Sequence, residues 1–505
     1  MLFKSKKFIL AASVTLSILV CLSGCGKGKS ADASLSKETE VTDVQTNIEL
    51  IESKELSNVK EDQIPDVTDV KWSFGLENTQ PIVSKDGKNV LIVEKEKMTW
   101  YDIESKKEVW SNSTYGNVGS YIISDDKLYL ADKYSYKNEK KEANIICLDV
   151  NTGKELWRYN VQKDLKPVTD KYMKENSKIS ISGSIKMTGD DGNLYVCASS
   201  SWDNDKDKDK AEVLLKIDKD GNKIWQTESH GFPGIMSMSE MTVFDGKIIM
   251  GNYSYGDDKT GPAFVGAYDI NTGKEAWHFD VKNDSDMAYT KTTNVNVGII
   301  GDKIVAVAGY GRAFVLDKDG NEINHFDLFK PEKHDDINLY TAVSHDNVEF
   351  GKNELIVSPN KTYLKDSSDS KGKLPAEHSD VGVIKVFDLD GNLNWKFRTG
   401  GTVTNIKTKG DYLVLGTCQN QDNYDYSYCG IYAFDISKDG KGKEIDTDNK
   451  DALEGYVGYF NTDGAILYNS VNISGDGKVI CATTWPTKVD TEKHGTHNLY
   501  TLKLS

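Results

Sequence analysis

The chain has 505 residues, 28% of them charged, and a formal net charge of −16 at pH 7. So acidic a surface disfavours nucleic acid as a partner, and it disfavours docking on anionic lipid by charge alone. The 42 glycines against only 9 prolines favour many short strands joined by tight turns.

The first 24 residues have the pattern of a secretory signal. Lys4, Lys6 and Lys7 precede an apolar run over residues 8–22, which is shorter than the ~20 residues of a bilayer span. The run ends in the sequence L-S-G-C, which resembles the lipobox of bacterial lipoproteins and predicts lipid attachment at Cys25. A diacylglyceryl group supplies the two acyl chains that lasting attachment requires. An ordinary secretory signal and an uncleaved anchor are the alternatives.

Residues 25–65 are polar and rich in acidic side chains. Such a composition buries too little apolar surface to fold, so we expect a flexible polar tether. A short helix near 48–56 is an alternative for part of it. The tether would carry a folded domain over residues 66–505.

A phrase with an aspartate, a glycine-bearing turn and a tryptophan recurs along this domain. Its best copy, at 267–277, contains Asp269, Gly273 and Trp277. The copy at 149–157 is nearly identical, and looser copies occupy 102–110, 218–225, 317–324 and 388–395. A phrase that returns in this way predicts a repeat architecture.

Residues 239–281 show what one repeat contains. Apolar runs at 241–244, 247–250, 263–268 and 274–281 alternate with turn signals, which predicts a four-stranded antiparallel meander, the unit of a propeller blade. Asp269 can accept hydrogen bonds from the turn amides, and Gly273 suits a turn position with positive φ. Trp277 opens the outer strand, where its ring can pack against the neighbouring blade.

Eight such units fit the chain, near 78–112, 116–161, 180–228, 234–281, 290–327, 340–398, 401–446 and 456–505. The last unit lacks an outer strand. Residues 68–76, which precede the first unit and belong to none, resemble an outer strand. We therefore predict an all-β, eight-bladed β-propeller of four-stranded antiparallel blades, closed by strand 68–76 pairing in the last blade.

The residues expected to dock neighbouring blades are Trp72, Trp110, Trp157, Trp225, Trp277 and Trp395. Two units depart from the pattern. Asn324 stands where a tryptophan is expected, and the unit at 401–446 has Asp435 but no tryptophan after it. We expect weaker contacts between those blades.

Five cysteines remain in the folded part, and their odd number argues against a full disulfide framework. Cys147, Cys197 and Cys481 lie in apolar runs and are interpreted as buried thiols. Cys418 and Cys429 flank the tyrosine-rich stretch 419–428. If that stretch is a hairpin loop, the two sulfurs can form a disulfide across its base in an oxidising exterior.

The phrase A-x-D-x-x-T-G-x-x-x-W at 267–277 resembles the tryptophan-docking motif of the PQQ-like (quinoprotein) β-propeller superfamily. The resemblance covers about residues 68–505 and implies the propeller fold. The superfamily includes quinoprotein alcohol dehydrogenases, which use PQQ and calcium, and non-enzymatic outer-membrane assembly lipoproteins. The dehydrogenases carry an adjacent Cys-Cys pair, and some carry a C-x-x-C-H haem site; this sequence has neither. No PQQ or calcium site is therefore carried over.

Other polar clusters give weaker evidence of a metal-binding site or a contact surface. Alternating aspartates at 203–209 have a spacing that suits Ca²⁺, but lysines alternate with them, so we expect a solvated loop. The Asp-x-Asp-Gly-Asn runs that begin at Asp218, Asp317 and Asp388 are interpreted as hairpin turns. His494 and His497 lack a nearby third metal ligand. The tyrosines at 424–428 are a candidate contact surface.

The sequence thus predicts a lipid-anchored, extracytoplasmic propeller that acts as a non-catalytic binding or scaffold module. Its expected partners are the membrane, through the anchor, and an unknown protein or small-molecule ligand at one face of the ring. The alternative is a divergent PQQ-dependent quinoprotein oxidoreductase, followed by carbohydrate binding or hydrolysis at the ring mouth. No catalytic residue, cofactor ligand or metal ligand is assigned.

Overall fold

The computed structural model describes residues 47–505 except for 58, 65–79, 95–96, 116–117, 133–141, 174–177, 205–206, 232–240, 255–260, 283, 285, 291–292, 360, 366–375, 419–428, 439–442, 446–454 and 490–491. All described residues belong to one compact unit, Thr42–Ser505. The predicted signal at 1–24, the predicted lipid-attachment residue Cys25 and the predicted closing strand around Trp72 lie outside the described residues.

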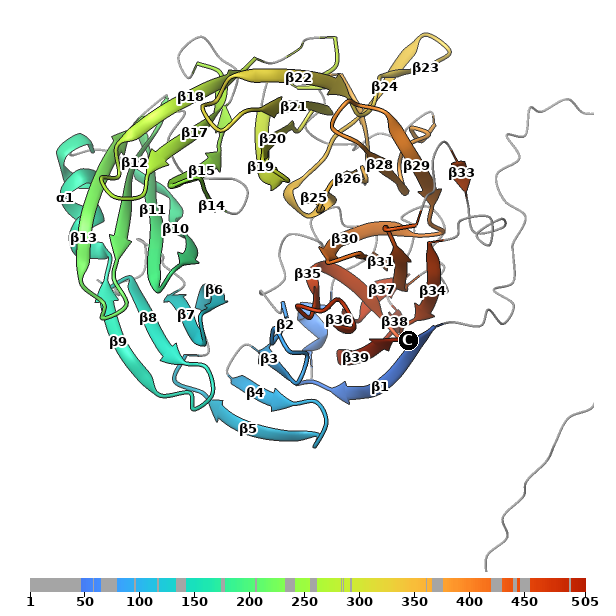
Figure 1. Ribbon diagram of the computed structural model, residues 1–505, viewed down its shortest axis with the longest axis horizontal. Coiled ribbons are helices and arrows are strands. Elements are labelled where there is room, and N and C mark those ends of the chain that lie inside the picture. Colours follow the sequence, from blue (N-terminus) through green and yellow to red (C-terminus); the bar gives the residue numbers. More distant parts are fainter. Residues whose placement is uncertain are drawn as a thin grey trace, which may run out of the picture. The chain divides into compact units, whose positions relative to one another are not determined.

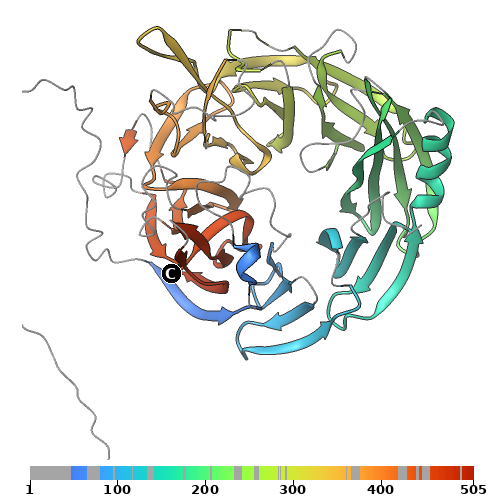
Figure 2. The ribbon, with the colours of Figure 1, turned by 180° about the vertical axis from the view of Figure 1, so that it is seen from behind.

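The described chain is built almost entirely of antiparallel sheets, eight of which have four or five strands. Figures 1 and 2 show these sheets standing around a common axis, with the first strand of each inside and the fourth strand outside. The fold is therefore an all-β propeller, and the eight sheets agree with the predicted number of blades. We number the blades 1 to 8 in chain order.

The blades consist of the following strands. Blade 1 contains β2 (Ile82–Val83), β3 (Asn89–Val93), β4 (Met98–Asp102) and β5 (Lys107–Asn112), and blade 2 contains β6 (Val118–Ser124), β7 (Lys127–Asp132), β8 (Asn144–Asp149) and β9 (Glu155–Asn160). Blade 3 contains β10 (Lys178–Asp190), β11 (Asn193–Asn204), β12 (Asp207–Ile217) and β13 (Lys223–His230), and blade 4 contains β14 (Thr242–Phe244), β15 (Lys247–Gly251), β17 (Ala263–Asp269) and β18 (Glu275–Val281). Blade 5 contains β19 (Thr293–Ile300), β20 (Lys303–Ala308), β21 (Arg312–Leu316) and β22 (Glu322–Asp327), with β16 (Tyr253–Ser254) added beside β19. Blade 6 contains β25 (Val348–Phe350), β26 (Leu355–Val357), β28 (Val383–Phe387) and β29 (Leu393–Arg398), with β33 (Lys443–Ile445) added beside β29. Blade 7 contains β30 (Thr402–Lys409), β31 (Tyr412–Cys418), β32 (Gly430–Asp435) and β34 (Tyr456–Asn461), and blade 8 contains β35 (Ala465–Ile473), β36 (Val479–Trp485), β39 (Asn498–Leu504) and β1 (Ile48–Glu55).

Other elements lie in the connections between these strands. They are α1 (Gln162–Tyr172), the 3-10 turns η1 (Glu61–Gln63) and η2 (His345–Asn347), and the short strands β23 (Glu332–His334), β24 (Ile337–Thr341), β27 (Thr362–Leu364), β37 (Thr487–Val489) and β38 (Glu492–His494).

The last blade is completed by an N-terminal strand, as expected, but the predicted residues were wrong. β1 pairs antiparallel with β39, from Ile48 opposite Leu504 to Glu55 opposite Asn498. This strand lies where we predicted tether or a short helix. An outer edge strand is held mainly by its backbone ladder and tolerates charged side chains, so the sequence IELIESKE carries little strand signal beyond the buried Ile48.

The boundary between blades 7 and 8 also differs from the predicted units 401–446 and 456–505. The outer strand of blade 7 is β34, which pairs with β32. β33, which lies in the predicted unit, pairs parallel with β29 of blade 6 instead. No tryptophan marks β34: its docking position, opposite Ala433, holds Gly458. Tyr456 packs within blade 7, with its ring centroid 5.7 Å from that of Phe434.

Each outer strand carries a β-bulge next to the docking position. In blade 1, Trp110 lies opposite Trp100 and Glu108 opposite Tyr101, which leaves Val109 as the extra residue. An extra residue of this kind is unpaired and bends the strand. The side chains of Val109, Leu156, Ile224 and Ile323 occupy this position in blades 1, 2, 3 and 5, and each is about half exposed.

Four of the predicted docking tryptophans make one repeated contact with the next blade. The indole N–H donates to a backbone carbonyl: Trp110 to Val150 (2.7 Å), Trp157 to Lys219 (3.0 Å), Trp225 to Ile270 (3.0 Å) and Trp277 to Lys318 (3.3 Å). The ring face lies on the glycine of the adjoining turn: Gly153, Gly221, Gly273 and Gly320, respectively. Trp395 differs, because it is buried and packs on Phe434, with the ring centroids 5.5 Å apart.

Asn324 preserves part of this contact. Its amide Nδ2 donates to the carbonyl of Leu389 at 3.2 Å, and the ring of Phe326 covers Gly391. The hydrogen bond and the ring that a tryptophan provides elsewhere are thus divided between two residues.

Candidate binding face

The two ends of the ring carry different kinds of connection. Because the strands of a blade are antiparallel, its first and third turns lie at one end, which we call the turn end. The second turn and the link to the next blade lie at the other, the loop end. Turn-end connections such as 125–126, 245–246 and 301–302 are short; the long segment 436–455, which contains β33, is an exception. The loop end carries α1 and the connections 328–347, 358–382 and 486–497.

The most prominent loop-end feature is a hairpin between blades 5 and 6. β23 and β24 pair from Glu332 opposite Leu339 to His334 opposite Ile337. β27 adds a third strand beside β24. Figure 1 shows the hairpin extending beyond the ring. The side chain of Ile337 at its tip is 44% exposed.

The base of this hairpin is held by a network centred on the buried His378. Its Nε2 lies 2.9 Å from the carbonyl oxygen of Lys330, and its Nδ1 accepts from the Asp380 amide at 3.1 Å. These partners assign the proton to Nε2. The Ser379 amide donates to Glu332 at 2.8 Å, and the Ser379 hydroxyl donates to the second oxygen of the same carboxylate. Burial opposes ionisation of Glu332, but the hydrogen bonds from Ser379 outweigh it and lower its pKa.

These residues do not form a nucleophilic triad. A serine nucleophile donates its hydroxyl proton to the histidine, whereas Ser379 donates to Glu332 and both nitrogens of His378 are engaged by backbone groups. The network therefore fixes segment 376–382 against β23. Lys385 adds to it through an ion pair with Asp380 at 2.6 Å.

Aromatic side chains join the neighbouring loops to this region. Tyr289 and Tyr363 stack with their centroids 4.0 Å apart, and the ammonium of Lys365 lies over Tyr340 and donates to the carbonyl of Ala288 at 2.7 Å. The connection that precedes blade 5 is thereby tied to β27. The loop end thus presents a fixed surface around the hairpin.

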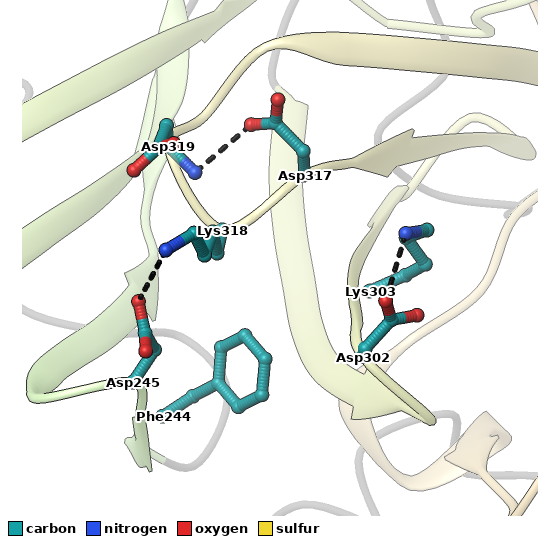
Figure 3. A pocket seen from close by; sticks show the side chains of 7 residues that line it. All are labelled: Phe244, Asp245, Asp302, Lys303, Asp317, Lys318 and Asp319. Carbon is teal, nitrogen blue, oxygen red and sulfur yellow. Dashed lines mark hydrogen bonds and ion pairs between the residues drawn. The ribbon is translucent and has the colours of Figure 1, made fainter.

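The turn end carries a shallow pocket between blades 4 and 5, of about 560 Å³, lined by Phe244, Asp245, Asp302, Lys303, Asp317, Lys318 and Asp319. Figure 3 shows lysines facing its carboxylates: Lys318 lies 3.7 Å from Asp245, and Lys303 lies 3.1 Å from Asp302. Lys247 and Lys318 lower the pKa of Asp245, and hydrogen bonds from Asn321 lower that of Asp317. These two carboxylates remain ionised at neutral pH, so neither supplies a proton for acid catalysis.

The sequence matches the family model described as outer membrane protein assembly factor BamB over residues 59–159 and 141–362. The chain belongs to this family. Its fold is that of the PQQ-like β-propeller superfamily, as the tryptophan motif predicted. No curated protein matches the chain significantly by sequence.

Solved structures agree with the propeller fold of this BamB-family chain. The quinohemoprotein alcohol dehydrogenase from Comamonas testosteroni is 12% identical, with a TM-score of 0.52, over 91% of this chain and 77% of that one. A europium-containing methanol dehydrogenase is 13% identical, with a TM-score of 0.52, over 89% of this chain and 95% of that one. BamB from Moraxella catarrhalis is 12% identical, with a TM-score of 0.49, over 90% and 99% of the two chains. Identities this low relate the folds and not the activities.

The aspartate-rich runs of this BamB-family chain divide into two kinds. Asp218, Asp317 and Asp388 each accept hydrogen bonds from the backbone and side chain of an asparagine in their own turn, which is the expected turn role. Asp209 accepts from His230 at 3.0 Å. The other three side chains of the 203–209 run lie outside the described ones. Among the described residues, no group of three or more His, Cys, Asp or Glu side chains is placed to hold a metal.

The remaining candidates have separate environments. Nδ1 of the buried His497 lies 2.9 Å from the carbonyl oxygen of Ser57, so this histidine fastens the segment after β1 to blade 8. The tyrosines at 424–428 lie outside the described residues. None of the helices in the described part of the chain has the length and hydrophobicity of a membrane span.

Sequence reasoning missed the network around His378. Glu332 is far from His378 and Ser379 in sequence, and the intervening segment carries no motif that predicts their meeting. The hairpin itself had a local signal, since the two acidic residues at 335–336 separate short stretches that can pair.

Proposed function

We propose that this protein is a lipid-anchored, extracytoplasmic propeller that binds a protein partner through its loop end and catalyses no reaction. The observation that carries the proposal is the hairpin β23–β24, whose base is fixed by His378 and Glu332 while Ile337 stands exposed at its tip. An apolar side chain on a rigid support loses little conformational entropy when a partner binds. The free energy gained by burying it is therefore offset less than it would be on a flexible loop.

Two further observations support this proposal. The family is described as an assembly factor, which favours a protein partner over a small molecule. The lipobox at Cys25 favours attachment to the membrane, with residues 26–46 as the tether. This tether is shorter than the sequence predicted, because β1 belongs to the propeller.

Site-specific photo-crosslinking tests the binding face. A photoreactive amino acid replaces Asp336 at the hairpin tip, and the matched control replaces Asp302 at the turn end. We expect a crosslinked protein of defined mass from position 336 in the membrane fraction, and its loss in the variant Ile337→Asp. Equal crosslinking from both positions, unchanged by Ile337→Asp, contradicts binding through the loop end.

The competing function, PQQ-dependent oxidation, needs a cation held by several oxygen ligands beside the quinone. The donor set of the described residues does not fit this requirement. Purified protein supplied with PQQ and Ca²⁺ and assayed with a redox dye tests it directly. Substrate-dependent dye reduction with alcohols or sugars overturns the non-catalytic proposal.

A further inference from the structure

We propose that Cys418 and Cys429 form a structural disulfide that closes the base of the β31–β32 hairpin. This proposal rests on the extracytoplasmic location proposed above. The two strands pair antiparallel up to Thr417 opposite Gly430, so the two cysteines occupy the next pair of opposing positions. Opposing residues of antiparallel strands have Cα atoms about 4.5–5.5 Å apart, within the range of about 4.4–6.8 Å that a disulfide spans.

The backbone holds both positions in place. Cys418 lies opposite Thr402 of the neighbouring strand β30. On the other side, the carbonyl oxygen of Cys429 accepts from the Thr462 amide at 2.9 Å and from Asn461 Nδ2 at 3.0 Å. Since both backbones are fixed in facing positions, the bond requires rotation of two side chains rather than movement of a strand.

The surroundings make this pair different from the other cysteines. Both side chains are fully buried in one apolar cluster with Ala465 and Leu467. Cys147, Cys197 and Cys481 lie in three other clusters, each with a single cysteine. Within the described part of the chain, Cys418 and Cys429 are therefore the pair placed to bond.

The reaction oxidises two thiols. Two S–H bonds break and one S–S bond forms, while two electrons and two protons pass to the disulfide of a thiol–disulfide oxidoreductase, which becomes a dithiol. Burial raises the pKa of Cys418 well above its usual range, so little thiolate exists after folding. The bond should therefore form before the hairpin packs into blade 7, and it should afterwards resist reductants in the native protein.

Differential alkylation of the wild-type protein tests the proposal. Full-length protein from the membrane fraction is denatured and alkylated with and without prior reduction. The masses of its peptides are then measured by mass spectrometry. We expect Cys147, Cys197 and Cys481 to be modified without reductant, and Cys418 and Cys429 only after reduction. Modification of Cys418 and Cys429 in the unreduced, denatured sample overturns the disulfide.

Two controls separate this outcome from the location on which it rests. A membrane-impermeant amine reagent applied to intact cells or spheroplasts reports whether the protein lies outside the cytoplasm. If the amine reagent labels the protein and residues 418 and 429 are still thiols, the disulfide is wrong and the location stands. If the reagent does not label the protein and the two residues are thiols, the location is wrong as well. The double variant C418S/C429S should melt about 3 °C lower than untreated wild type, and no lower than wild type that has been reduced while unfolded and then refolded with reductant. Cys481→Ser, the matched single replacement, keeps the disulfide, so the same treatment should lower its melting temperature by as much as that of the wild type.

Discussion

The indole contacts that recur in the first half of the ring lie at its rim, whereas the asparagine contacts that recur in the second half lie near its axis. From blade 1 to blade 5, an indole ring on each of the first four outer strands lies on a glycine of the next blade, and Asn324 with Phe326 continues the series. From blade 6 onward, asparagines near the axis bond to the next blade. Asn347 Nδ2 donates to Val403 O at 3.0 Å, Asn405 Nδ2 to Leu467 O at 2.6 Å, and Asn472 Oδ1 accepts from Val83 N at 3.1 Å. A blade junction can therefore be fixed from its rim or from its centre.

The largest effect should come from disturbing a rim contact. Gly153 and Gly246 have nearly the same φ, +67° and +70°, but a Cβ on Gly153 would lie 2.7 Å from the Trp110 ring, whereas one on Gly246 would meet nothing within 4 Å. Gly246→Ala should lower the free energy of unfolding by about 1 kcal/mol, because it adds only backbone strain. Gly153→Ala should lower it by about 3–4 kcal/mol, because the indole ring of Trp110 must also move. Urea unfolding followed by tryptophan fluorescence measures both, and equal costs contradict docking by Trp110.

Removal of a central contact should cost somewhat less. Asn405 is buried, donates to Leu467 O and accepts from the Ser470 amide at 3.0 Å. Asn405→Ala leaves both backbone groups unsatisfied and should lower the free energy of unfolding by about 2–3 kcal/mol. The exposed Asn338→Ala on the hairpin is the control and should stay within about 0.5 kcal/mol. A loss at position 405 no greater than this control would show that the Asn405 bonds add nothing measurable to the junction of blades 7 and 8.

Mild acid should weaken the junction at which the ring closes. Burial lowers the pKa of His497 below its ordinary 6.5, although its bond to Ser57 and the charge of Glu94 oppose the shift. Below about pH 6.5 the unfolded chain binds a proton that the folded chain does not, so this contribution to stability is present at higher pH and falls as the pH drops. Melting between pH 7.5 and 5.5 should show this loss in the wild type and a smaller one in His497→Gln. If the melting temperatures of the wild type and His497→Gln change equally with pH, His497 is not the source of the acid sensitivity.

The smallest effect is expected at a bulge. Ile224 is about half exposed, and its side chain stands apart from the contact that Trp225 makes with blade 4. Ile224→Thr should therefore change the free energy of unfolding by less than about 0.5 kcal/mol. Trp225→Ala, next to it, should cost at least about 2 kcal/mol, measured by circular dichroism in urea. Similar losses at the two positions would show that the rim contact does not depend on the indole.

The difference between the halves also explains what the sequence could predict. Each phrase places an aspartate, a glycine and a tryptophan close together in the chain, and the glycine of one phrase meets the tryptophan of the preceding one. The sequence therefore located blades 1 to 5 well. β1 and β34 carry no such phrase. The first was predicted as tether or a short helix, and the second was placed in the wrong unit. The network of Glu332, His378 and Ser379 was missed because it forms only when two long connections fold together.

The pairing of β1 with β39 constrains the order of events when the protein is made. Residues 48–55 are synthesised long before their partner strand, 498–504, so a nascent chain cannot complete blade 8 until the other seven blades have been made. Until then this blade keeps an open edge, which a holding chaperone or premature pairing with another chain can occupy. Removal of β39 should therefore harm the assembly of the protein far more than the number of residues removed suggests.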